Sequence, residues 1–97
     1  MKNEQLISVE QVCTQYRVEM SFIDSLSTFG LIEIVTSETT PCIGTEQLKR
    51  LEQFMHLHYD LDINLEGIDV ISNMLQRMDQ MQDEIKTLRN RLRFYED

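Results

Sequence analysis

The sequence is poor in residues that break helices or cross-link chains. Its 97 residues include one proline, three glycines, two cysteines and no tryptophan. Because proline and glycine are the residues least compatible with helix interiors, long stretches are free to be helical. Cys13 and Cys42 have no CxxC spacing. We therefore expect two reduced thiols, with a disulfide between them as an alternative that no other feature of the sequence supports.

Positive charge is also scarce. Nine Lys and Arg residues stand against 17 Asp and Glu residues, which gives a formal net charge of −8. Because Lys and Arg supply non-specific affinity for phosphates, this balance argues against general binding of nucleic acid. It argues equally against docking on an anionic membrane surface. A basic protein partner remains compatible with it.

Long apolar runs are missing as well. No stretch approaches the roughly 18 consecutive apolar residues of a membrane-spanning helix, and the first residues lead into no run of signal-peptide length. We therefore expect a cytoplasmic protein. The hydrophobic fraction of 41% and the absence of low complexity indicate a folding chain. Its length suits one small domain, or one domain with an appended helix.

The first half predicts two short helices joined by a tight turn. Ser8 begins a capping-box pattern that ends at Gln11, which predicts the start of the first helix. We expect this helix to end near Arg17 and the second to begin near Glu19. Gly30 follows the second apolar stripe, where a left-handed residue ends many helices. The stripes are Val9, Val12, Cys13 and Tyr16, then Phe22, Ile23, Leu26 and Phe29.

The middle of the chain predicts a short hairpin and a linker helix. Residues 33–43 are rich in β-branched side chains and contain Pro41, which suits an edge strand. Thr45 is the expected N-cap of a third helix. Residues 59–63 interrupt that helix, and Asn64 caps the next one. We expect a winged helix-turn-helix domain with its linker helix over residues 1–63 and a long dimerisation helix over residues 64–97.

Apolar residues repeat every seven positions in the last third of the chain. The two sets are Ile71, Met78, Ile85 and Leu92, and Met74, Met81, Leu88 and Tyr95. Such a heptad pattern predicts a coiled coil, and therefore a homodimer through these eight residues. Charges beside the seam suit a parallel pair, but an antiparallel pair remains equally open. The alternative is that the stripe packs only on its own domain.

The negative charge is unevenly distributed along the chain. Residues 1–44 hold two basic and six acidic residues, residues 45–70 again two and six, and residues 71–97 five of each. The excess therefore lies on the globular part. Residues 19–29, in the position of a DNA-reading helix, include no Lys or Arg, the residues that most often read bases. DNA reading is therefore disfavoured.

This order of elements resembles two related groups of proteins. The segments ISVEQV at residues 7–12 and FGLI at 29–32 resemble the winged helix-turn-helix of MerR-type regulators. The whole chain, over roughly residues 5–95, is more similar to chaperone modulators of the CbpM type. It shares with them its size, its acidity, the segment LDINLEGI at 61–68 and LRNRL at 88–92. The implied fold is mostly α: a MerR-like winged helix-turn-helix with a small two-stranded wing and a long C-terminal coiled-coil helix.

The resemblance also implies a function. CbpM-type modulators bind the J-domain of a DnaJ-like co-chaperone, CbpA, and inhibit its stimulation of Hsp70, and J-domains carry a positively charged second helix. We therefore expect a partner-binding surface of carboxylates, and the alternative for each is an ordinary solvated charge. The candidates are Asp24, Glu33, Asp60, Asp62 and Glu66. The alternative functions are a MerR-like DNA-binding transcriptional regulator without an effector domain and a purely structural coiled-coil adaptor.

Catalytic and metal-binding patterns are weak. His56 and His58 are two positions apart on a helix and point to different faces, so they suit one metal ion poorly. Cys13 lies on an apolar helix face, which favours packing over reactivity. Several of the six methionines are seam residues. No phosphate-binding loop or nucleophile set is present, so we expect no cofactor, no metal and no enzymatic activity.

Overall fold

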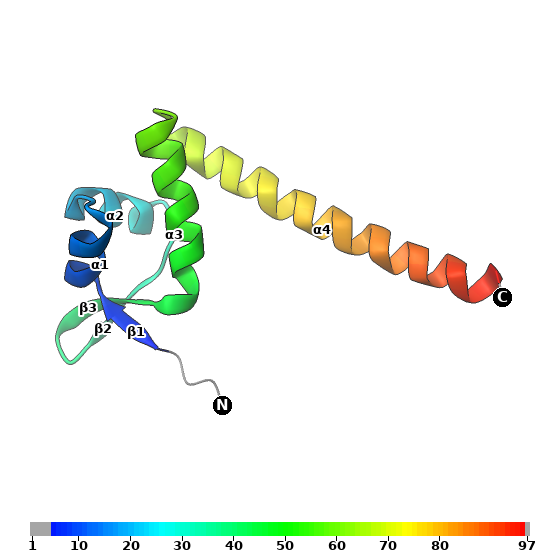
Figure 1. The fold of residues 1–97 in the computed structure, drawn as a ribbon, viewed down its shortest axis with the longest axis horizontal. Helices are drawn as coiled ribbons and strands as arrows, with labels where there is room; N and C mark the ends of the chain where they lie inside the picture. Colours follow the sequence, from blue (N-terminus) through cyan, green and yellow to red (C-terminus); the bar gives the residue numbers. More distant parts are fainter. Residues whose placement is uncertain (1–4, 97) are drawn as a thin grey trace.

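The computed structural model describes residues 5–96 and consists of a small globular part from which one long helix projects (Figure 1). Figure 1 labels the strands and the α-helices; η1 is a 3-10 turn and η2 a π-helix. The elements are, in chain order, β1 (Leu6–Ser8), α1 (Val9–Tyr16), α2 (Met20–Thr28), β2 (Ile34–Ser37), β3 (Thr40–Gly44), η1 (Thr45–Gln47), α3 (Leu48–Met55), η2 (His56–Asp60) and α4 (Leu65–Glu96).

The predicted helix-turn-helix is present with its predicted end signals. The backbone N–H of Gln11 donates to the Ser8 hydroxyl at 3.1 Å, which caps α1. Arg17 ends α1 in the left-handed conformation, with φ 57°. After α2, Gly30 has φ 75°, and the N–H of Leu31 donates to the Leu26 carbonyl at 2.9 Å. Glycine tolerates this conformation because it has no Cβ.

The wing contains three strands rather than the two expected from the sequence. β2 and β3 form the predicted hairpin, and β1 pairs antiparallel with the other edge of β3. Ile7 lies opposite Ile43 in this pairing. A strand of three residues shows too little alternation to be recognised, and it forms here because β3 offers it a free edge. Thr45 is not the N-cap expected for the third helix: it is the first residue of η1, whose N-cap is Gly44, and the N-cap of α3 is Gln47.

The core lies where α1, α2, α3 and the sheet meet the start of α4. Its fully buried side chains are Val9, Val12, Ile23, Leu26, Ile43, Leu51 and Ile68. Ile68 is the contribution of α4, and Ser72, one turn later, is also buried. The first two turns of α4 are therefore anchored in the globular part. This anchoring determines the direction in which the rest of the helix projects.

α4 is far longer than its anchored part, and the remainder is exposed. The 32-residue helix would span about 48 Å at 1.5 Å per residue. The globular part reaches only its first turns (Figure 1). Of the helices within residues 5–96, none combines the length and the apolar character needed to cross a membrane.

Candidate partner-binding surface

The chain turns sharply between α3 and α4 in a segment, residues 56–64, that we call the elbow (Figure 1). Its backbone is held internally: the N–H of Leu61 donates to the His56 carbonyl at 3.2 Å, and that of Ile63 to the Leu57 carbonyl at 3.0 Å. Asp62 is left-handed, with φ 57°. Asn64 then caps α4, because its side-chain oxygen accepts from the Gly67 N–H at 2.8 Å, as the sequence predicted.

Aromatic contacts fasten the elbow to α2. The rings of His58 and Phe22 are stacked with centroids 4.8 Å apart, and Tyr59 meets Phe22 edge-on at 5.2 Å. Nδ1 of His58 donates to the Ile63 carbonyl at 2.9 Å. His58 therefore has a packing role beside Tyr59. These contacts join the elbow to α2 of the helix-turn-helix.

The elbow exposes apolar and acidic side chains together. Tyr59 is 49% exposed and Leu61 54% exposed. The three acidic candidates nearest to them, Asp60, Asp62 and Glu66, are also exposed. One carboxylate oxygen of Asp60 lies 2.8 Å from Nδ1 of His56, one helical turn earlier. This mixture of large apolar groups and carboxylates is suited to a basic protein surface.

A cleft of about 320 Å³ lies between the α1–α2 turn and the α3–η2 helix. Two carboxylates, from Glu52 and Asp60, and the Tyr59 ring contribute to its lining. The Tyr16 hydroxyl donates to Glu52 at 2.8 Å. This hydrogen bond, aided by partial burial and by the Glu52 charge, raises the pKa of Tyr16 above its usual 10.0. The remaining lining residues are Arg17, Val18, Met55 and His56.

Sequence reasoning did not single out Tyr16 and Glu52 as functional residues. They are 36 positions apart, and no motif links them. Tyr16 was predicted only as a core position of the first helix, and its ring does pack against the core. Their hydrogen bond arises from the packing of α1 against α3. No local pattern of the sequence carries a signal for it.

Asp24 and Glu33 lie apart from the elbow acids. Asp24 is exposed on α2, close enough to Cys13 that its charge adds to burial in raising the pKa of that thiol. Glu33 lies before β2, where the Gln47 side chain accepts from its N–H at 2.8 Å and donates to its carbonyl at 2.9 Å. Gln47 directly precedes α3, and the elbow begins after the other end of α3, about 14 Å away along the helix.

The five acidic candidates therefore do not form one continuous patch. Asp60 and Asp62 lie in the elbow and Glu66 in the first turn of α4 directly after it, whereas Glu33 lies beside Gln47, at the opposite end of α3. Asp24 belongs to the exposed face of α2, together with Glu19, Ser21 and Thr28. One compact partner would contact one of these groups more readily than all of them.

Seven of the eight proposed dimerisation residues are solvent-exposed. They are 48–82% exposed and comprise Met74, Met78, Met81, Ile85, Leu88, Leu92 and Tyr95. Ile71 is half-buried. Within the described residues, the stripe therefore does not pack on its own domain beyond its first position. Further large apolar groups on the same helix are exposed too, including Val70, Leu75 and Phe94.

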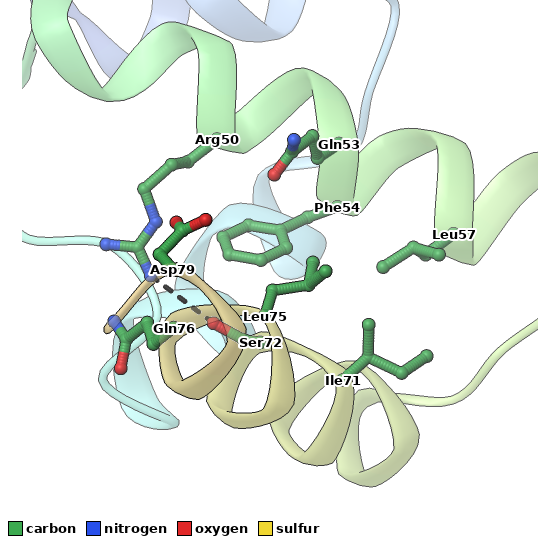
Figure 2. Close-up of a pocket in the computed structure, with 9 residues that line it drawn as sticks. All are labelled: Arg50, Gln53, Phe54, Leu57, Ile71, Ser72, Leu75, Gln76 and Asp79. Carbon is green, nitrogen blue, oxygen red and sulfur yellow. Dashed lines mark hydrogen bonds between the residues drawn. The ribbon is translucent and has the colours of Figure 1, made fainter. Parts of the chain in front are cut away.

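Ile71 lines a groove of about 210 Å³ between α3 and α4 (Figure 2). Figure 2 shows Phe54 of α3 and Leu57 of η2 on one side and Ile71 and Leu75 of α4 on the other. A guanidinium nitrogen of Arg50 donates to the buried Ser72 hydroxyl at 3.4 Å across the end of the groove. The exposed apolar stripe of α4 is therefore continuous with the globular part.

The thiols of Cys13 and Cys42 are both free. Over residues 5–96, no group of three or more His, Cys, Asp or Glu side chains is arranged to hold a metal ion.

A family model described as "MerR HTH family regulatory protein" matches residues 7–90. The matched range begins in β1 and includes the helix-turn-helix, the wing, the elbow and most of α4. Neither a curated protein nor a solved structure matches the chain.

Proposed function

The chain belongs to the MerR HTH family of regulatory proteins, and we propose that within this family it is a chaperone modulator of the CbpM type that binds a protein in place of DNA. Its partner is the J-domain of a DnaJ/CbpA-like co-chaperone. Binding inhibits the stimulation of Hsp70 by that co-chaperone. The observation that carries the proposal is the charge of α2 and its surroundings.

In a winged helix-turn-helix, the second helix enters the major groove, and Arg or Lys side chains there contact guanine. α2 has no basic residue, and none occurs anywhere between Arg17 and Lys49. The charges of this region are instead carboxylates, all exposed: Glu19, Asp24, Glu33, Glu38 and Glu46. Such a surface repels phosphates and attracts a basic protein surface.

Inhibition follows from competition for one surface. The second helix expected of a J-domain is positively charged and engages Hsp70. An acidic domain bound to that helix excludes Hsp70 without touching the chaperone itself. Charges at the edge of an interface mainly accelerate association, and salt screens them. The association rate, and with it the affinity, should therefore fall as the salt concentration rises.

The proposal is tested by titrating the chain with the isolated J-domain of the co-chaperone from the same cell, using calorimetry. We expect saturable binding that weakens with salt, and a loss of Hsp70 ATPase stimulation at matching concentrations. Lysine replacement of Asp24, Asp60 and Asp62 should weaken binding. Absence of binding, or undiminished ATPase stimulation at saturation, would refute the proposed function.

The functional unit proposed is a homodimer, and charge favours an antiparallel coil. Residues 57–76 contain four acidic and no basic residues, whereas residues 85–95 contain four basic and no acidic residues. Antiparallel pairing places the basic end of one copy beside the acidic elbow of the other. Parallel pairing places two strongly acidic globular parts side by side, which costs free energy by repulsion.

One antiparallel register also matches charges along the seam. It pairs Ile71 with Leu88 of the second copy and Met78 with Met81, and it sets Arg77 against Glu84. A photoreactive benzoylphenylalanine at position 91 then crosslinks to the second copy near Val70. A crosslink to the last residues of the second copy would indicate a parallel coil.

A DNA-binding transcriptional regulator without an effector domain is the second candidate, and the family match itself favours it. A heparin column separates the two functions, because heparin retains DNA-binding proteins through their basic surfaces. We expect the chain to flow through at low salt. Retention would favour the regulator, and failure to bind both DNA and a J-domain would leave a structural adaptor.

A further inference from the structure

We propose that the cleft between the α1–α2 turn and the α3–η2 helix is a receptor for one Arg or Lys side chain of the protein partner. The inference rests on the proposed function and specifies where the basic surface of the J-domain is anchored. Two carboxylates, from Glu52 and Asp60, face a cleft of about 320 Å³ whose apolar surface comes from Val18, Met55 and Tyr59.

The shape and chemistry of the cleft suit a long basic side chain. Such a chain has an apolar stem and a charged head, and it is most stable where the stem packs while the head meets acceptors. The Tyr59 ring, 49% exposed, offers a face for the stem or for a cation–π contact. Glu52 and Asp60 offer oxygens for the head.

Both carboxylates are already oriented by the chain itself. The Tyr16 hydroxyl donates to Glu52 at 2.8 Å, and Nδ1 of His56 lies 2.8 Å from Asp60. Each of these contacts engages one carboxylate oxygen, so further lone pairs remain for an incoming cation. A site whose acceptors are held in place before binding loses less conformational entropy when it is occupied.

The backbone around the cleft is equally constrained. η2 is a π-helix, a conformation that occurs frequently at functional sites. The T-shaped contact of Tyr59 with Phe22 fixes its ring to α2. The cleft is also lined by one basic side chain, Arg17, which competes with an incoming cation for the two carboxylates.

The test measures J-domain affinity by calorimetry for Tyr59→Ala, Glu52→Gln and Asp60→Asn. The conservative variants keep the side-chain shape and an oxygen acceptor for Tyr16 or His56. Each should weaken binding by about tenfold, as expected when an anchor at the centre of an interface loses about 1.4 kcal/mol. The matched control is Glu46→Gln, an exposed carboxylate on η1, which should change affinity less than twofold.

A spectroscopic readout distinguishes anchoring from a general loss of charge. A cation bound to Glu52 stabilises the carboxylate and competes with the Tyr16 hydroxyl, so ultraviolet titration should show the pKa of Tyr16 falling toward 10 in the complex. Circular dichroism confirms that Tyr59→Ala remains folded. If the wild type binds the J-domain and the cleft variants bind it as tightly as Glu46→Gln does, the proposed role of the cleft is refuted but the proposed function stands. No binding by the wild type overturns both.

Discussion

Shortening two seam side chains should break the proposed dimer without unfolding α4. The change is the double substitution Ile85→Ala and Leu88→Ala, at neighbouring seam positions of the projecting helix. Alanine is the best helix former, so the helix of a single chain should not be weakened. Neither residue contacts the globular part, since both lie more than a dozen residues beyond Ile71.

The magnitude follows from the exposure of these side chains in one chain. Ile85 is 48% exposed and Leu88 is 56% exposed. Fully burying such a side chain contributes roughly 1.5–3 kcal/mol, so covering about half of it contributes roughly 1 kcal/mol. Two residues in two chains give roughly 4 kcal/mol. The dissociation constant of the dimer should therefore rise by about two to three orders of magnitude.

Sedimentation equilibrium over a concentration series measures this constant. The matched control is Asn90→Ala, which removes an exposed side chain from the outer face of the same helix. We expect the control to sediment as the wild type does, and the double variant to sediment as a monomer at the same concentrations. A wild-type chain that is monomeric at tens of micromolar, or a double variant that dimerises unchanged, would refute the reasoning.

Two further predictions concern the globular part. Ser8→Ala removes the acceptor of the Gln11 N–H and should lower the free energy of unfolding by about 1 kcal/mol, as measured by urea titration. A loss of less than a few tenths of a kcal/mol would contradict the role of Ser8 as the N-cap of α1. Since the pKa of Tyr16 is raised in the folded state, the folded chain retains this proton above the usual value of 10.0, and stability should fall as pH rises through and beyond it. Glu52→Gln should bring the ultraviolet titration of Tyr16 closer to 10 and reduce that loss of stability.

Local patterns were sufficient for most of the fold. Ser8 and Gly30 mark helix ends through hydrogen bonds that span only a few residues, so their sequence signals are strong. Asn64 begins α4 for the same reason. By contrast, β1 depends on the free edge of β3, almost 40 residues later, and its three residues predict nothing alone.

For the candidate site, the sequence predicted the negative charge but not the arrangement of the residues that carry it. The acidity of the globular part can be read from composition, but composition does not say which carboxylates are neighbours. Folding separates Glu33 from Asp60 and Asp62 by the length of α3, and it brings Glu52 and Tyr16 together at the cleft. These groupings depend on how α3 packs between α1 and α4. That packing involves residues tens of positions apart.

The sequence alone therefore determined the order of elements, the heptad seam and the opposite charges of the elbow and the end of α4. Each of these depends on residue types at short, regular spacings. Only the tertiary structure decided that the wing has a third strand, that His58 of η2 stacks on Phe22, and that two carboxylates line one cleft. These features depend on contacts between distant segments, whose free energy no local pattern encodes.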